Sequence, residues 1–311
     1  MHTWATVLDA AGVRDERLRA DFTHRRGTVA RYRPHAYLAV RLLLPARLVA
    51  PVIALTAFMH HTDTLLDTGP AAGRDEVWKR WEEDVRSALA AGHSRHPVLR
   101  PVLHTMAAHP ALHGHIEDFL AAAPTDLHFT GFATEADYQE YVGSYSLPAF
   151  MLIAGLLAPD GADTAAYRAA CRLYIDGSQR LDFVNDLAED LRDGRLTIPQ
   201  ETLREHGVTR AGLAAGQDTP GTRAMLDELL TRARRSLAES GSLASLAVAD
   251  ARPLVRAMTA LESLTADAAR ASGCGVLHRS ARPSLPGALG VLAREYRGAL
   301  RLRAASGRRR G

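Results

Sequence analysis

Apolar residues recur at three- and four-residue intervals along almost the whole 311-residue chain. Runs rich in Val, Ile, Thr and Tyr that alternate with polar residues, the pattern of a half-buried strand, are nearly absent. The sequence therefore predicts an all-α fold. Helices are expected at residues 47–67, 75–91, 97–108, 111–122, 135–157, 165–192, 220–240, 251–272 and 286–303, separated by breakers that include Pro124, Pro159, Gly194 and Pro283.

The composition is that of an ordinary globular protein, with 47% hydrophobic and 23% charged residues. No long polar linker divides the chain, so we expect a single helical domain at residues 31–303, preceded by an N-terminal extension at 1–30 and followed by a basic tail at 304–311. Aromatic residues do not interleave with that tail, so no nucleic-acid partner is expected. The apolar segments contain arginine and proline or are too short to span a bilayer, which favours a cytoplasmic protein.

A first acidic cluster lies near the end of the very apolar helix expected at residues 47–67. On a helical wheel His60, Asp63 and Asp67 share a narrow arc. A charge in apolar surroundings needs a partner because its desolvation is costly, so we expect the two carboxylates to bind a ligand. A plain surface pair at the helix end is the alternative. His60 is either a further metal ligand or a hydrogen-bonding neighbour.

A second acidic cluster occupies one face of the helix expected at residues 165–192. An arc of about 80° holds five polar side chains, namely Gln179, Asp182, Asp186, Asp190 and Asp193. An amphipathic surface helix would explain this pattern. However, such faces usually interleave basic residues, and Arg180 and Arg192 both point away from the arc. Carboxylates stacked at i,i+4 repel one another, so the sequence predicts a hard cation shared between the two clusters.

In their order along the chain, these motifs resemble those of the squalene/phytoene synthase family. A Leu-Leu-Pro segment at 43–45 stands the expected distance before Phe58 and the first acidic cluster. The Asp-Leu pair at 126–127 precedes a helix that carries Tyr141. The segment at 194–199 is similar to the family's Gly-Arg-x-x-x-Pro turn behind the second acidic motif. Two acidic motifs in this order, with the turn behind the second, are a specific signal.

The resemblance implies a single-domain bundle of helices around a central apolar cavity, with the two acidic helices at its mouth and the uncharged run at 146–159 along its wall. It implies Mg²⁺ as cofactor and a prenyl diphosphate as substrate, and it leaves NADPH use and the oligomeric state open. A lipophilic product would give a peripheral membrane contact. Catalysis is assigned to Asp63, Asp67, Asp186 and Asp190, metal binding to Asp63, Asp67, Asp182, Asp186, Glu189 and Asp190, and substrate binding to His60, Tyr141, Gln179, Asp182, Asn185 and Arg195.

Several positions depart from the family pattern. Thr64 stands in place of the second of two adjacent aspartates, and Asp182 in place of an asparagine. His60 and Asn185 stand where the family has arginine, which removes two bidentate diphosphate donors. Ionisation of prenyl diphosphate is expected, with head-to-head condensation of two C15 or C20 chains as the leading reaction. The alternatives are a terpene synthase or cyclase acting on a single chain, a helical metal oxidase and a non-catalytic helical binding protein.

Overall fold

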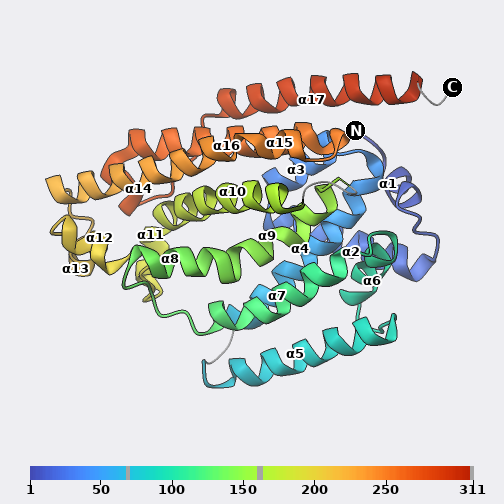
Figure 1. Cartoon of the computed structure of the whole chain (residues 1–311), viewed down its shortest axis with the longest axis horizontal. Coiled ribbons are helices and arrows are strands. Elements are labelled where there is room, and N and C mark those ends of the chain that lie inside the picture. Colours follow the sequence, from blue (N-terminus) through green and yellow to red (C-terminus); the bar gives the residue numbers. More distant parts are fainter. Residues whose placement is uncertain (68–70, 160–163, 309–311) are drawn as a thin grey trace.

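The computed structural model describes the backbone at residues 1–67, 71–159 and 164–308, and the side chains of these residues apart from those at 67, 71–72 and 305–308. Within these ranges every regular element is a helix (Figure 1), which confirms the all-α prediction. The α-helices are α1 (Trp4–Ala10), α2 (Glu16–Tyr32), α3 (Pro34–Leu43), α4 (Ala46–Asp67), α5 (Ala71–Ala91), α6 (Leu99–Ala108), α7 (Leu112–Leu127), α8 (Glu135–Tyr141), α9 (Leu147–Ala154), α10 (Thr164–Asn185), α11 (Leu187–Arg192), α12 (Gln200–Glu205), α13 (Arg210–Ala214), α14 (Pro220–Glu239), α15 (Leu243–Leu246), α16 (Arg252–Ser272) and α17 (Leu285–Arg308).

The observed helices differ from the expected ones at three points that matter for the fold. Pro124 lies inside α7, so the break predicted there was wrong. Its ring removes one hydrogen bond near the end of the helix, and the neighbouring Leu120 and Ala123 are fully buried, which compensates for the loss. The helix expected at 165–192 divides at Asp186 into α10 and α11, and the one expected at 135–157 divides into α8, a π-helical segment and α9.

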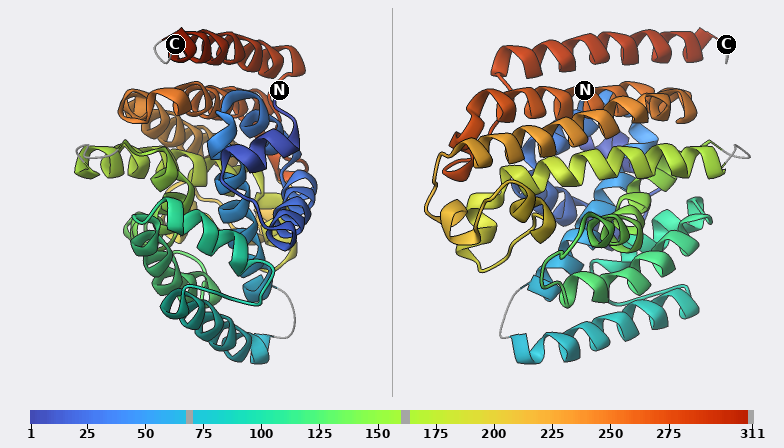
Figure 2. Two further views of the ribbon diagram at one scale, coloured as in Figure 1. Left: turned by 90° about the vertical axis from the view of Figure 1, so that its right-hand side faces the viewer. Right: turned by 60° about the vertical axis from the view of Figure 1, so that its left-hand side comes forward.

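The helices form stacked layers around two central helices, α4 and α10 (Figures 1 and 2). Helix α10 packs along α14, and α16 packs against both α14 and the outermost helix, α17. Helix α4 contacts α1, α2, α6 and α9, and α5 lies at the edge opposite α17. The two helices that carry the predicted acidic clusters are therefore both core elements, which fixes the position of the clusters.

Residues 1–30, which we expected as an extension, pack into the main core. Val7 of α1 and Phe22 of α2 belong to the same buried cluster as Ile53 of α4. Next to Phe22, the Asp21 carboxylate accepts a hydrogen bond of 2.8 Å from the Arg100 guanidinium of α6. This hydrogen bond joins α2 to α6. Helix α2 also packs along α4, and its last residue, Tyr32, lies beside His60 of the first acidic cluster.

A glycine allows α10 and α14 to approach closely. A Cβ atom on Gly177 would lie 2.7 Å from the backbone oxygen of Ala233 and 2.7 Å from the side chain of Leu237. A real Cβ atom does not approach other atoms so closely, and the Ala233 backbone cannot move aside without the rest of α14. Glycine at this position therefore sets the spacing of the two helices, one turn before the second acidic cluster begins.

One described helix is long and apolar enough to cross a membrane when judged only by length and composition. It is the continuous rod Glu135–Leu157, which contains α8 and α9. In its most apolar window 56% of the residues are buried inside the protein. Such burial is typical of a core helix in a large bundle.

Candidate active site

The first acidic cluster faces a π-helical segment, Val142–Ser146, that interrupts the rod between α8 and α9. Pro148 lacks the N–H that an α-helix would direct at the carbonyl of residue 144, and the Leu147 N–H instead bonds to the carbonyl of Val142, five residues back. Such widened turns are frequent at functional sites. Here the turn carries Tyr145, whose hydroxyl donates a hydrogen bond of 3.4 Å to the Asp63 carboxylate of α4.

A polar cluster connects Tyr141 to the Gly-Arg turn that follows the second acidic motif. The Tyr141 hydroxyl donates a hydrogen bond of 2.8 Å to Asp126, and the same carboxylate oxygen lies 3.5 Å from the Arg195 guanidinium. Arg195 also stacks over the ring of Phe129 at 5.2 Å. Burial, together with the Asp126 charge, raises the pKa of Tyr141 far above its ordinary value, so its hydroxyl keeps its proton.

The second acidic cluster lies at the bend between α10 and α11. Asp186 has a non-helical backbone there, yet its N–H bonds to the Asp182 carbonyl at 2.8 Å and its carbonyl accepts from Asp190 at 2.9 Å. The i,i+4 neighbours thus stay on one side of the bend. Desolvation and the charges of Asp190 and Glu189 raise the pKa of Asp186, and desolvation raises that of Asp190, which accepts a hydrogen bond of 3.0 Å from Thr197.

Arg33, at the junction of α2 and α3, lies between the two acidic clusters, and the sequence analysis missed it. The Tyr32 ring stacks on the His60 ring at a centroid distance of 3.7 Å. The Arg33 guanidinium lies over the Tyr32 ring, 5.1 Å from its centroid. Although desolvation opposes the charge, Tyr32, Asp182 and Asp186 raise the pKa of Arg33. Desolvation and the Arg33 charge lower the pKa of His60, which is therefore neutral at pH 7.

Deeper in the molecule, Asp182 lies close to a second carboxylate from another helix. Desolvation, followed by the charge of Glu262 on α16, raises the pKa of Asp182 to about 7. Desolvation also raises the pKa of Glu262, which accepts a hydrogen bond of 3.1 Å from Ser178. Gln179, predicted to bind substrate, accepts a hydrogen bond of 3.0 Å from Ser146. This part of the site is therefore a half-buried polar layer between α9, α10 and α16.

Asn185, also predicted to bind substrate, holds the chain segment that precedes α17. Its amide oxygen accepts a hydrogen bond of 3.1 Å from the Ala281 N–H, and its amide nitrogen donates one of 3.3 Å to the Ala281 carbonyl. Both polar ends of the side chain are thus engaged within the protein. A contact between Asn185 and substrate stays a prediction.

Carboxylates are the side chains at the site that could hold a metal ion. Among the residues whose side chains are described, no three His, Cys, Asp or Glu side chains converge into a cage. The side chain of Asp67 lies outside that set, and Glu189 is exposed. Magnesium is commonly held by one or two carboxylates plus the oxygens of a phosphorylated substrate and water. The donors present, Asp63 on one side and Asp186 with Asp190 on the other, fit that mode of binding.

A small apolar space lies beyond the polar layer, where the sequence predicted the wall of a central cavity. Its volume is about 20 Å³, and it lies among Phe150, Ile153, Ala154, Leu157, Tyr167, Tyr174, Leu243, Val255 and Met258. Phe150 stacks on Tyr174 at 5.2 Å. Phe150 and Ile153 therefore lie where the sequence suggested, but a prenyl chain would need these side chains to move, because ligand cavities usually measure hundreds of cubic ångströms.

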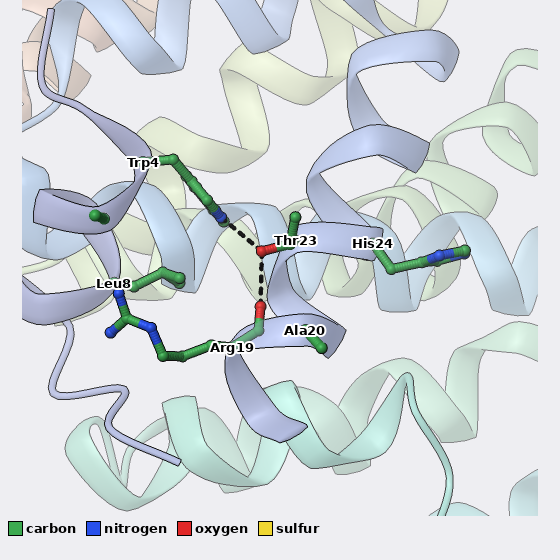
Figure 3. A pocket seen from close by; sticks show the side chains of 7 residues that line it. Trp4, Leu8, Arg19, Ala20, Thr23 and His24 are labelled. Atoms are coloured by element: carbon green, nitrogen blue, oxygen red, sulfur yellow. Dashed lines mark hydrogen bonds between the residues drawn. The ribbon is translucent and has the colours of Figure 1, made fainter. Parts of the chain in front are cut away.

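A larger pocket lies at the N-terminal end of the molecule, away from the acidic clusters. It has a volume of about 550 Å³ and is formed by α1 and α2, with Trp4, Leu8 and Arg19 among its lining residues (Figure 3). The Trp4 indole donates a hydrogen bond of 2.9 Å to the Thr23 hydroxyl, which in turn donates to the carbonyl of Arg19 at 2.7 Å. These polar groups form hydrogen bonds with one another, so the pocket offers fewer groups for binding or catalysis than the acidic site does.

The sequence relatives of this chain include several phytoene synthases. Residues 29–287 match the family described as squalene/phytoene synthase. Over 237 residues the chain is 28% identical to the bifunctional protein CrtB/UppS of Streptomyces coelicolor, a match that covers 76% of this chain and 41% of that protein. It is 28% identical over 232 residues to the phytoene synthase of Arthrospira platensis, covering 70% of this chain and 74% of that protein.

A third relative, the chloroplastic phytoene synthase of Daucus carota, is 29% identical over 237 residues, which is 58% of its length. The chain thus spans roughly half the length of two of these three relatives.

Two solved structures share the fold. A dehydrosqualene synthase superposes with a TM-score of 0.76 at 18% identity and covers 91% of this chain and 98% of its own. The squalene synthase HpnC from Alicyclobacillus acidocaldarius gives a TM-score of 0.68 at 22% identity, covering 86% and 96%. Members of the matched family are prenyltransferases. The match to the family pattern extends over residues 29–287, which is well over half of this chain. The chain therefore belongs to the squalene/phytoene synthase family.

Proposed function

We propose that this protein is a magnesium-dependent prenyltransferase that ionises a prenyl diphosphate and joins two C15 or C20 chains head to head. The observation that carries the proposal is the position of Arg33 between the two acidic clusters. Tyr32 stacks on His60 beside the first cluster, and the charges of Asp182 and Asp186 in the second cluster raise the pKa of the neighbouring Arg33. Two separate helices would thus supply carboxylates, and Arg33 a cation, to one site that binds a metal diphosphate.

Asp63, Asp186 and Asp190 would hold the magnesium ions, which supply positive charge to the departing diphosphate. Desolvation raises the pKa values of Asp186 and Asp190, and the charges of Asp190 and Glu189 add to the rise at Asp186; a bound cation would stabilise both ionised carboxylates. Arg33 adds a guanidinium that stays charged and can donate two hydrogen bonds to one phosphate. It supplies a cation that His60, neutral at pH 7, cannot supply.

The apolar residues beneath the polar layer would receive the prenyl chain. Phe150 and Tyr174 separate the acidic layer from the bundle interior. Closing such residues around the chain excludes water, which would otherwise capture the allylic cation. Tyr145 and Tyr141 would border the reacting carbons with hydroxyl groups whose protons are directed at Asp63 and Asp126.

A terpene synthase that acts on one prenyl chain is the second candidate, and the small size of the apolar space favours it. The apolar space, of about 20 Å³, must expand to hold one prenyl chain and must expand further to hold two. The two reactions differ in product size. Coupling doubles the carbon number of the substrate, whereas cyclisation or elimination retains it.

Isotope mixing distinguishes these reactions in one experiment. The protein is incubated with magnesium and an equal mixture of unlabelled and fully deuterated farnesyl or geranylgeranyl diphosphate, with and without NADPH, and the lipid extract is analysed by mass spectrometry. Head-to-head coupling gives three masses, the middle one half labelled. A doublet at single-chain mass would support the terpene synthase, and loss of all products with EDTA tests the metal requirement. Turnover that persists in EDTA would refute the magnesium proposal.

A further inference from the structure

Helix α17 presents an uncovered line of leucines on its outer side. Leu285 is 75% exposed, Leu289 63% and Leu300 45%, and together they are three of the six exposed large hydrophobic side chains among the described residues. With a rotation of 100° per residue they lie within an arc of about 60°. Helix α17 is outermost in every view, and no described element covers this side (Figures 1 and 2). The line is therefore an apolar face without a partner.

Arginines run along one flank of this apolar face. Arg294, Arg297 and Arg301 follow one another at spacings of three and four residues and are exposed. With Arg256 of α16 they line a groove of about 270 Å³ between the two helices. The one carboxylate in the groove, Glu295, is 4% exposed and already accepts hydrogen bonds from Arg256 at 2.7 Å and Arg294 at 2.9 Å. Four guanidinium groups against one carboxylate leave the groove positive.

We propose that the outer face of α17 docks on the surface of an anionic lipid bilayer, with the leucines in the interface and the arginines at the headgroup phosphates. A helix that combines an apolar line with a basic flank binds in this way. A second copy of the chain fits less well, because a two-fold contact through this face would bring two positive grooves together. The matched family region ends at residue 287, so α17 lies almost entirely beyond it.

The position of α17 would relate the membrane to the reaction site. Helix α16 packs directly against α17, and its Val255 and Met258 line the apolar space beneath the polar layer. Arg303 fixes α17 to the body of the protein through hydrogen bonds of 3.1 and 2.8 Å to the carbonyls of Leu42 and Leu44. One helix thus separates the docking face from the apolar interior. The inference rests on α17 itself and stands whether or not the proposed reaction is correct.

Sedimentation with vesicles tests the charge requirement without any substrate. The full chain is mixed with vesicles of phosphatidylcholine alone or of phosphatidylcholine with about one third phosphatidylglycerol. We expect binding to the anionic vesicles, and a roughly thirtyfold weaker partition for the double variant Arg297→Ala/Arg301→Ala. The matched control, Arg17→Ala/Arg204→Ala, removes two exposed arginines from other helices and should bind like the parent protein. Equal binding by the two double variants would overturn the proposal.

A second variant tests the apolar line. Leu285→Gln/Leu289→Gln should retain the helical circular-dichroism signal, because both side chains are exposed, and should lose most vesicle binding. Unchanged vesicle binding by this variant would also refute the proposal. If light scattering finds a dimer that the same two substitutions dissociate, the occupant of the face is a second copy, and the bilayer assignment is wrong.

Discussion

Replacement of Asp182 by asparagine should raise the stability of the protein at neutral and alkaline pH and leave it almost unchanged in acid. Burial near Glu262 raises the pKa of Asp182 from 3.8 to about 7. The folded state therefore binds this proton more tightly than the unfolded chain does. The resulting stabilisation is complete below about pH 4 and is lost as the pH rises through 7. Asparagine keeps the shape of the protonated acid but never acquires the buried charge.

The size of the effect follows from the difference between the two pKa values. A difference of about three units corresponds to roughly 4 kcal/mol, since each unit is worth about 1.4 kcal/mol. The free energy of unfolding of Asp182→Asn should match that of the parent protein near pH 4. It should exceed the parent value by up to roughly 4 kcal/mol above pH 7, with the change concentrated between these limits.

Urea unfolding followed by circular dichroism at a series of pH values measures this difference directly. EDTA must be present, because a bound cation would stabilise the ionised carboxylate. Asp137→Asn is a control of opposite sign. The backbone N–H groups of Thr134 and Ala133 lower the pKa of Asp137, so its loss should destabilise the protein at neutral pH. Parallel stability curves for Asp182→Asn and the parent protein would refute the electrostatic reasoning.

Three further outcomes are expected. Arg33→Gln should lower kcat/KM for prenyl diphosphate by roughly ten- to a hundredfold through loss of a charge-assisted hydrogen bond. Arg31→Gln, in the last turn of α2, should not lower it, and equal steady-state constants for both variants would exclude a role for Arg33. Asp186→Asn should abolish product formation measured by mass spectrometry with an unchanged circular-dichroism spectrum, and near-normal turnover would rule out the metal site. Gly177→Val should cost about 1–3 kcal/mol in urea unfolding because its Cβ meets α14 at 2.7 Å, while Gly114→Ala, with open space around it, should not.

Local spacing along the chain was enough to predict most helices beyond residue 46 and to find both acidic clusters, but α1, α2 and α3 were not predicted. Asp63 and Asp186 could each be assigned to a helix face, because residues three and four apart share one face of any α-helix. The same reasoning correctly predicted that Arg180 points away from the acidic arc. Arg180 pairs with Glu135 on the other side of α10. Periodicity failed at Pro124, where tertiary burial of α7 outweighed a local helix breaker.

The cation between the clusters could not be found in this way. Arg33 comes within range of the Asp182 charge only in the folded bundle, and no local pattern encodes that approach across 149 positions of sequence. Its one local sign was Pro34, which ends α2 and sets Arg33 at the turn into α3. Glu262 was missed for the same reason, since α16 meets α10 only in the folded bundle. Long-range electrostatic partners thus have no signature in a single sequence.

The paired hydrogen bonds between Asn185 and Ala281 make two distant parts of the chain open together. An amide side chain that donates to the carbonyl and accepts from the N–H of one residue reproduces the pairing of two strands. Asn185 is the last residue of α10, directly before the bend at Asp186, and Ala281 lies in the segment that leads to α17. Release of that segment would free the end of α10. The acidic bend and the C-terminal helix therefore belong to one cooperative unit of local unfolding, and disturbance of either should be felt in the amide exchange of both.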